Sequence, residues 1–477
     1  MKILLITGKL AEEIVRKYGQ GADVKVCDID IAAFITPTLL EDVDLSSYDL
    51  VLVPGLTYNY DWESFEKKRG VKVRLGPIHA YDLQHVLRVA DKVEFSHQIP
   101  ACRLIESVKA DEVIREVDAF EEKHLFKIGD VAIGGESRMK VVAEIASFKD
   151  FDDLERKIEY YTESGADIID IGVPLEFDSE WLSKVLKVAV EVSDLPLSVD
   201  TFSKKAIEIG VKHGVDMVMS ISRENLDALD VIENQAVVVV DRNVEGLTKL
   251  LNTVKKRTEK AIADPVLDPP LRVAESIVRY TQFRELDPET PVLFGAGNVT
   301  ELSDADSIGI NAILAFIAEE IGCNLLFTTE ASPKTTGSVR ELKIASYLAK
   351  AAKIRDSPPK DAGVSLLVLK EKVRYEEERI NLNNVVEAEE SREFIRDPLG
   401  DFIIQVVDGK IVCRHDSMTI IGKKAKEVVD TAIRHNLLSR LDHAAYLGRE
   451  LMKAEIAALL RKSYIQDRDL NFGYYQK

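Results

Sequence analysis

Short apolar runs, each followed by polar or acidic residues, recur eight times between residues 141 and 330. The runs cover 141–143, 168–171, 197–199, 217–219, 236–240, 261–263, 292–294 and 325–327. Stretches of helical periodicity lie between them, for example at 154–164, 181–192, 204–213 and 311–321. Apolar runs bounded by turn residues are typical of buried strands, and their alternation with helices favours a parallel sheet. Eight strand–helix units in succession therefore predict an α/β fold with a central (β/α)8 TIM barrel.

The residues that close these strands include six carboxylates. They are Glu144, Asp170, Asp200, Asp241, Asp264 and Glu330. Because the active site of such a barrel lies at the carboxyl ends of its strands, we expect these side chains around the barrel mouth, with almost no Lys or Arg. A mouth of this kind suits a ligand rich in hydrogen-bond donors and repels an anionic ligand.

Strand and turn signals outside the barrel predict further domains. Residues 1–110 alternate between apolar strands and short helices, which predicts a flavodoxin-like α/β domain. A charged helical connector is expected at 111–137, and the barrel at 138–357. Consecutive prolines at 358 and 359 precede a C-terminal α+β domain at 361–477. Its expected elements are strands at 364–369, 402–407 and 410–414, a hairpin turn at 408–409, and helices at 423–435 and 441–462.

Composition excludes several classes of function. The formal net charge of −19 disfavours binding to nucleic acid or to anionic membranes. No apolar run approaches the roughly 18 residues of a membrane span, and residues 1–8 have a strand pattern rather than that of a signal peptide. Four cysteines far apart in the sequence indicate reduced thiols. We therefore expect a cytoplasmic protein without nucleic-acid or membrane partners.

Three of the strand ends carry informative sequences. Residues 165–172 are Gly-Ala-Asp-Ile-Ile-Asp-Ile-Gly, residues 195–201 are Leu-Pro-Leu-Ser-Val-Asp-Thr, and residues 215–222 are Val-Asp-Met-Val-Met-Ser-Ile-Ser. In this order on eight strands, with Asp-Pro at 264–265, they resemble the pterin-binding superfamily, which contains dihydropteroate synthases and methyltetrahydrofolate-type methyltransferases. The whole chain, with extra domains at both ends, resembles the archaeal proteins described as dihydropteroate synthase-related.

The resemblance implies a pterin site at these strand ends. A pterin presents an amino group and a ring N–H along one edge, and a carboxylate can accept both hydrogen bonds. Asp264 matches the carboxylate that grips this edge, Asp200 matches a second pterin-site aspartate, and Asp170 is expected in the same cavity. Ser220 occupies the place of an Asn common to pterin sites, for which Asn225 can substitute. The alternative for Asp200 and Asp264 is that each caps the helix that follows it.

Departures from the family pattern distinguish between the two reactions of the superfamily, dihydropteroate synthesis and methyl transfer. The Asn-Val-Thr-Pro-Asp-Ser-Phe type of segment that begins a synthase barrel is replaced by Ala-Glu-Ile-Ala-Ser-Phe at 143–148. The basic residues that a synthase places after strands seven and eight are replaced by Gly-Ala-Gly-Asn-Val-Thr at 295–300 and Phe-Thr-Thr-Glu at 327–330. Without those basic groups a diphosphate leaving group has little stabilisation. The segment at 295–300 resembles the methyltransferase pattern, whose Asn, here Asn298, contacts N5 of the pterin; the alternative is a glycine-rich turn.

These features together predict a pterin-binding enzyme of folate or tetrahydromethanopterin one-carbon metabolism. A methyltransferase that uses reduced tetrahydromethanopterin or tetrahydrofolate is preferred; the alternatives are a divergent dihydropteroate synthase and a non-catalytic pterin carrier or scaffold. The catalytic candidates are Asn298, with Glu144, Asp241 or Glu330 as the acid that protonates N5. No metal-binding motif is present, although Glu144, Asp170 and Asp241 can hold magnesium through oxygen. The corrinoid motif Asp-x-His-x-x-Gly is absent, so we expect a corrinoid methyl acceptor to be a partner protein, and the chain to form a homodimer.

Overall fold

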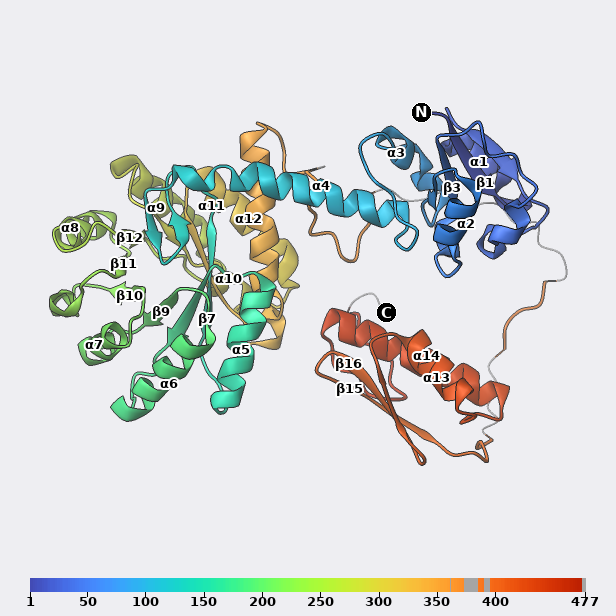
Figure 1. Ribbon diagram of the computed structural model, residues 1–477. Helices are drawn as coiled ribbons and strands as arrows, with labels where there is room; N and C mark the ends of the chain where they lie inside the picture. The colour runs from blue at the N-terminus through green and yellow to red at the C-terminus, as the bar shows by residue number, and fades with distance from the viewer. Residues whose placement is uncertain (361, 373–384, 390–394, 474–477) are drawn as a thin grey trace. The chain divides into compact units, whose positions relative to one another are not determined.

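The computed structural model describes residues 1–360, 362–372, 385–389 and 395–473, whose course is shown in Figure 1. The chain divides into two compact units, Met1–Glu376 and Glu377–Lys477, and each is described by itself. None of the helices in these described residues combines the length and the apolar character that crossing a membrane requires.

Eight parallel strands form a barrel in the first unit (Figure 1). They are β7 (Lys140–Ile145), β8 (Ile168–Gly172), β9 (Leu197–Asp200), β10 (Met217–Ile221), β11 (Ala236–Val240), β12 (Ala261–Asp264), β13 (Leu293–Phe294) and β14 (Leu325–Thr329). The sheet order is β12-β11-β10-β9-β8-β7-β14-β13, and a bridge between Ala263 and Val292 joins its two end strands. The predicted barrel is therefore confirmed, and each of the eight apolar runs contributes one strand.

Helices cover the outside of this barrel. They are α5 (Phe151–Ser164), α6 (Ser179–Val192), α7 (Lys204–Lys212), α8 (Val244–Val254), α9 (Val273–Leu286), the single turn α10 (Gly297–Thr300), α11 (Ser307–Ile321) and α12 (Ser338–Ile354). After β10 a short 3-10 segment, Leu226–Val231, takes the place of an α-helix. Side chains of Asp150, Asp178 and Ser203 cap the first turns of α5, α6 and α7, which fixes where these helices begin.

Side chains inside the barrel change from apolar to acidic along the strands. Successive side chains of a strand point to opposite faces, so Val142 and Ile168 join an inner apolar cluster while their sequence neighbours pack against the helices. Two residues further along β7 and β8, the same alternation turns Glu144 and Asp170 inward. The carboxyl ends of the strands therefore enclose polar side chains above an apolar floor.

A hairpin that the sequence pattern did not predict covers the amino-terminal end of the barrel. The expected helical connector at 111–137 is α-helical only to the end of α4 (Ala101–Asp118); its later part forms β5 (Phe126–Ile128) and β6 (Val131–Ile133). Ile128 and Ile133 belong to the inner apolar cluster of the barrel. Because the hairpin fills this end, the opposite end is left for a ligand.

Two smaller sheets lie outside the barrel. In the first unit β1 (Ile3–Thr7), β2 (Asp23–Val26), β3 (Leu50–Val53) and β4 (Val73–Leu75) are parallel in the order β2-β1-β3-β4, the flavodoxin-like arrangement, with α1 (Glu12–Tyr18), α2 (Trp62–Arg69) and α3 (Leu83–Arg88). The second unit combines the antiparallel strands β15 (Phe402–Val407), β16 (Lys410–His415) and β17 (Thr419–Gly422) with α13 (Ala425–Arg434) and α14 (Leu441–Leu460).

The strand predicted at 364–369 is wrong. This segment is irregular, and Leu367, Val368 and Leu369 are each more than half exposed. An apolar run forms a stable strand only when a neighbouring strand supplies the hydrogen-bond ladder, and none pairs with it among the described residues.

A buried ion network joins the foot of the barrel to α12. Asp167, directly before β8, accepts hydrogen bonds from Arg138 (2.7 Å), from Lys343 on α12 (2.8 Å) and from the backbone N–H of Val141 (2.8 Å). Burial alone would raise the pKa of Asp167, but Arg138 and Lys343 outweigh it and hold this pKa well below its usual range. The carboxylate is therefore charged and central to the network.

We expect Asp167→Ala to lower the free energy of unfolding by about 3–5 kcal/mol, because it leaves two largely buried cations without their counter-charge. Urea denaturation followed by circular dichroism measures this loss. Asp194→Ala, at an exposed aspartate before β9, is the matched control and should change stability by no more than about 0.5 kcal/mol. A loss below about 1 kcal/mol in the Asp167 variant would contradict the importance of the network.

Candidate active site

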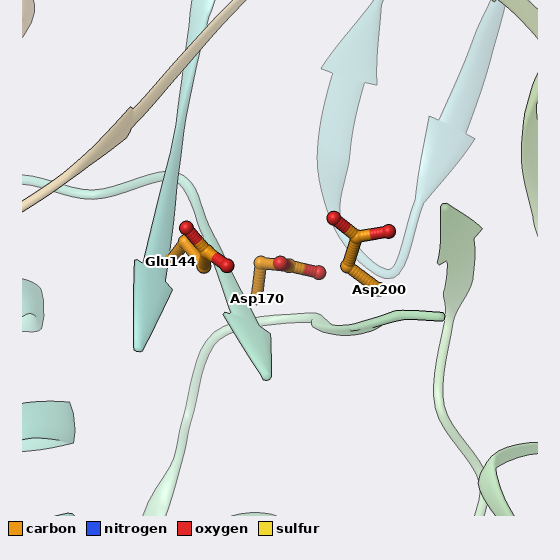
Figure 2. A group of neighbouring side chains, drawn as sticks. All are labelled: Glu144, Asp170 and Asp200. Carbon is orange, nitrogen blue, oxygen red and sulfur yellow. The ribbon is translucent and has the colours of Figure 1, made fainter. Parts of the chain in front are cut away.

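Three carboxylates from neighbouring strands meet inside the barrel mouth. Glu144 on β7, Asp170 on β8 and Asp200 on β9 each place one oxygen within 4.8 Å of the others. Asp170 lies between the other two side chains (Figure 2). Strand register creates this grouping, since Glu144 pairs with Asp170 and Gly172 pairs with Asp200.

Gly172 gives Glu144 the space it occupies. A Cβ at position 172 would lie 2.8 Å from Oε1 of Glu144 and 3.3 Å from the Cα of Ala146. Any larger residue would push the carboxylate away from its place in the cluster or displace the backbone. The glycine is therefore a packing requirement of the acidic group.

The cluster holds more negative charge than a buried site tolerates. Asp170 is fully buried, and the hydroxyl of Ser198, its partner across β8 and β9, is the hydrogen-bonding group that lowers its pKa, although the contact falls short of good hydrogen-bond geometry. Burial, with the charges of Asp200 and Glu144, raises the pKa of Asp170 well above its ordinary value. Burial and the neighbouring Asp200 raise the pKa of Glu144 to about 7, and burial also raises the pKa of Asp200. Without a positively charged or donor-rich ligand, the carboxyls of the cluster hold their protons to a higher pH than isolated carboxyls do.

A strained residue at the end of β10 holds Asp200. Ser220 has a φ of 70°, in the left-handed region, where the register between β10 and β11 is irregular. Its hydroxyl donates to Oδ1 of Asp200 at 2.5 Å. Non-glycine residues adopt this conformation at a cost and gather at functional sites. The structure thus brings Ser220 to the acidic cluster through Asp200.

Asp264 ends β12 in largely buried surroundings. Its Oδ1 accepts hydrogen bonds from the backbone N–H of Val266 (2.8 Å) and from the hydroxyl of Tyr280 (3.3 Å), whose one proton is shared with the backbone carbonyl of Leu293 (3.0 Å). Burial raises the pKa of Asp264 to about 6, although these two hydrogen bonds oppose the rise. Since both bonds use Oδ1, the carboxylate is oriented while Oδ2 keeps its capacity to accept from a ligand.

Arg279 on α9 braces the loop that follows Asp264. Its guanidinium donates to the carbonyls of Pro265 (2.6 Å) and Val266, and to Asp268 (2.6 Å). Val266 has a φ of 67°, which is strained for a β-branched residue. The brace maintains this conformation and with it the hydrogen bond from Val266 to Asp264.

Asn298, in α10, is tied to the same loop. Its Nδ2 donates to the backbone carbonyl of Leu267 at 2.8 Å. Because a carbonyl only accepts, the partner fixes which amide atom is the nitrogen. Oδ1 of Asn298 is therefore left as an acceptor.

The alternative in which Asp200 and Asp264 cap the following helices is wrong. Ser203, not Asp200, accepts the N–H in the first turn of α7. Within the described chain no side chain caps α9 after Asp264. Both aspartates are instead directed to contacts at the strand ends.

Asp241 does not join the acidic cluster, contrary to the magnesium-ligand set expected from the sequence. It forms an ion pair with Arg223 (3.0 Å) and accepts a hydrogen bond from the backbone N–H of Asn243 (2.8 Å). Asp200 takes its place beside Glu144 and Asp170. Arg223 and Arg242, on the loops after β10 and β11, also correct the expectation of a mouth almost without cations; each side chain is more than 60% exposed. The sequence shows both arginines but not their pairing with Asp241 and Asp268.

Glu330 and Asn225 hold loops in place. Glu330 accepts hydrogen bonds from the backbone of Gly337 (2.8 Å) and Val339 (3.1 Å), so it caps the start of α12, and from Tyr160 (2.8 Å). Asn225 accepts from the backbone of Ser222 (2.8 Å) and donates to the carbonyl of Ser220 (3.2 Å). Tyr280 and Arg279, which the sequence pattern did not single out, contact Asp264 and its loop instead.

The raised pKa of Asp264 makes a pH-dependent contribution to stability. A carboxyl of this kind stabilises the fold below its unfolded pKa, about 4, and this contribution is lost as the pH rises through about 6. We expect Asp264→Asn, measured in EDTA, to be more stable than the parent protein at pH 8 by about 1–3 kcal/mol. Urea denaturation at pH 5 and pH 8 tests this, with Asp194→Ala as the variant that keeps the parent's pH dependence. If the Asp264→Asn variant has the same pH dependence of stability as the parent protein, the carboxyl of Asp264 in the parent titrates at its ordinary pKa.

Two family profiles match this chain. The one described as Pterin binding enzyme covers residues 140–326, from β7 into β14. The one described as PterinBD-DUF4346 covers residues 396–467, most of the second unit.

Several solved structures are similar over less than half of the chain. The 7,8-dihydropteroate synthase of Vibrio fischeri ES114 is 15% identical and covers 47% of this chain and 95% of its own, with a TM-score of 0.38. The Yersinia pestis dihydropteroate synthase is 16% identical and covers 49% of this chain and 99% of its own, also with a TM-score of 0.38. The Xanthomonas albilineans enzyme in complex with 7,8-dihydropteroate is 20% identical and covers 43% of this chain and 91% of its own, with a TM-score of 0.35.

One sequence relative covers nearly the whole chain. The uncharacterized protein MJ0107 of Methanocaldococcus jannaschii is 39% identical in an alignment of 529 positions, gaps included, which covers 98% of this chain and 99% of that protein. The similarity therefore includes the regions on both sides of the barrel. The resemblance inferred from the strand-end sequences is confirmed: the chain belongs to the pterin-binding superfamily, in one family with the M. jannaschii protein.

Proposed function

We propose that the chain is a transferase that binds a reduced pterin, tetrahydromethanopterin or tetrahydrofolate, in the barrel mouth and transfers a one-carbon unit, most simply a methyl group. The observation that carries this proposal is the carboxylate of Asp264, buried, oriented and with Oδ2 left to accept. The amino group and ring N–H of a pterin form a planar donor pair that such a carboxylate can accept.

The loop after β12 supports this assignment by orienting Asp264 before a ligand arrives. Val266 and Tyr280 fix its Oδ1, and Arg279 fixes Val266. A binding group that is already ordered loses little conformational entropy when it binds. Its hydrogen bonds are also stronger in a site shielded from water.

The charge of the mouth favours methyl transfer over condensation with a diphosphate. Two unit charges about 4 Å apart interact by roughly 4 kcal/mol at an effective dielectric of 20, so each carboxylate of the cluster that is ionised opposes a diphosphate. Arg223 and Arg242 are already paired with Asp241 and Asp268. Oδ1 of Asn298 can accept a hydrogen bond from protonated N5, the form in which a methylated pterin becomes a good leaving group. The proposed methyl acceptor is a separate corrinoid protein.

We expect Asp264→Ala to weaken binding of a reduced pterin by at least about 30-fold, because it leaves two ligand donors without their acceptor. Pterin fluorescence titration measures the dissociation constant, and circular dichroism checks that the variant is folded. Asp194→Ala, an exposed aspartate outside the mouth, should bind like the parent protein. An unchanged dissociation constant in the Asp264 variant would refute the proposed pterin contact.

A divergent dihydropteroate synthase is the second candidate, and it is supported by the family to which the barrel belongs. We expect no robust condensation of a pterin diphosphate with p-aminobenzoate, even with magnesium present. The measurement is product formation by chromatography, beside a methyl-transfer assay with tetrahydropterin and a corrinoid acceptor. Rapid dihydropteroate formation would replace the methyltransferase proposal with the synthase. Pterin binding without either activity would favour a carrier.

A further inference from the structure

A cavity of about 90 Å³ opens at the carboxyl ends of the parallel strands β1, β3 and β4. The strand order in this sheet is β2-β1-β3-β4, so the chain goes to one side of β1 for β2 and to the other side for β3 and β4. In open α/β sheets, ligands bind in the crevice that such a reversal leaves at the carboxyl ends of the strands. The residues that line the cavity lie between Leu5 and Leu83, so a ligand there shares none of them with the proposed pterin site.

The walls of this cavity are apolar. Leu5 on β1 and Leu52 on β3 line it from the sheet, and helices α1 and α3 contribute Val15 and Leu83. None of the described residues that line it has an ionisable side chain. One water molecule needs roughly 15 Å³, and an apolar cavity of about 150 Å³ in another protein stays dry and binds benzene. Because protein interiors leave few voids of this size, a small apolar group is a better occupant than water.

Thr7 places one hydrogen-bonding group in these apolar surroundings. It lines the cavity and is only 1% exposed. It follows Leu5 by two residues on β1, so both side chains lie on the face of the sheet that α1 and α3 cover. The hydroxyl donates its proton to the carbonyl of Gly8 at 3.4 Å, which leaves its oxygen able to accept a hydrogen bond. A ligand with one N–H or O–H donor would satisfy this oxygen.

Exposed apolar side chains extend the surface beside the cavity. Leu10, Phe34 and Leu56 are 73%, 58% and 45% exposed. They belong to short 3-10 turns that follow β1, β2 and β3, and the turn after β2 contacts the other two. The turns after β1 and β2 also line the cavity, through Ala11 and Ala32. Exposed apolar groups gathered in this way mark a binding surface, whereas isolated ones do not.

We propose that this cavity binds a small molecule through an uncharged aromatic ring that carries one N–H or O–H group, as an indole or a phenol does. The ring packs against Leu5 and Leu52, and its donor binds the hydroxyl oxygen of Thr7. The ring is uncharged because a charge buried among these side chains would have no partner. A flat ring also buries much apolar area while losing little conformational freedom, which favours it over a flexible chain.

This second binding site goes beyond the proposed function and does not depend on it. It uses the four-stranded sheet and its helices, whereas the proposed pterin contact uses Asp264 in the barrel. Binding at one site therefore requires no residue of the other.

Titration of the full-length protein with 5-fluoroindole, observed by fluorine NMR, tests the site. We expect saturable binding with a dissociation constant in the low millimolar range or below, as is usual for so small a ligand. Ala80→Leu adds a larger side chain to the cavity wall and should weaken binding at least tenfold. Thr7→Val keeps the shape of the side chain but removes the acceptor, and should weaken binding about threefold or more. Ala445→Leu, at an exposed position of α14, is the matched control and should bind like the parent protein.

Circular dichroism checks that each variant is folded, and Ala11→Leu, also in the cavity wall, serves if Ala80→Leu is not. Binding by the parent and by Ala445→Leu that is weakened in the cavity-filling variant and in Thr7→Val supports the site. No saturable binding by the parent up to the solubility limit of the probe, or equal binding by the parent and the cavity-filling variant, overturns it. Equal binding by Thr7→Val and the parent refutes the assigned hydrogen bond. Pterin titration of the cavity-filling variant should match the parent, so failure of this site and failure of the proposed function are distinguishable.

Discussion

Alternation of side chains along the barrel strands is the constraint on which the site depends. Glu144 follows the inward-facing Val142 by two residues, and Asp170 follows Ile168 in the same way. Hydrogen-bond ladders fix these strands, so both carboxylates stay on the inner face of the barrel, and that of Asp170 is fully buried there. Their charge must be relieved inside the barrel by protons, by a cation or by the donors of a ligand. Burying these carboxylates is unfavourable. The apolar cluster beneath them, which the β5–β6 hairpin closes, stabilises the barrel and offsets that unfavourable free energy.

Two residues with a strained backbone conformation, Ser220 and Val266, hold Asp200 and Asp264 in place. Ser220 and Val266 both have positive φ angles, and each such residue costs on the order of 1–3 kcal/mol. Ser220 hydrogen-bonds to Asp200, and the backbone of Val266 hydrogen-bonds to Asp264, so strain and site coincide at β10 and β12. Arg279 offsets the strain at Val266 by binding its carbonyl and that of Pro265. The carboxylate of Asp264 is therefore held rigidly, and a ligand can bind to it without reordering the loop.

Much of the fold could be predicted because it rests on local patterns. Each barrel strand is a buried apolar run, and the helix starts at Asp150, Asp178 and Ser203 follow from short polar side chains that accept backbone N–H groups. The run at 364–369 has the same local appearance but pairs with no strand among the residues that the structure describes, so periodicity alone misjudged it. The hairpin at 126–133 was missed for the opposite reason, since its two three-residue strands are too short to show a period.

The sequence by itself determined which residues close the barrel strands, and therefore that Glu144, Asp170, Asp200 and Asp264 lie toward one end of the fold. Only the tertiary structure decided how these carboxylates divide. The register of β7, β8 and β9 brings Glu144, Asp170 and Asp200 together. Asp241 instead forms an ion pair with Arg223, and Glu330 accepts a hydrogen bond from the backbone at the start of α12. Asp264 received Tyr280 from a helix that begins nine residues later. A carboxylate's chemistry depends on its neighbours in space, and those neighbours are set by strand pairing and helix packing over distances that no local pattern records.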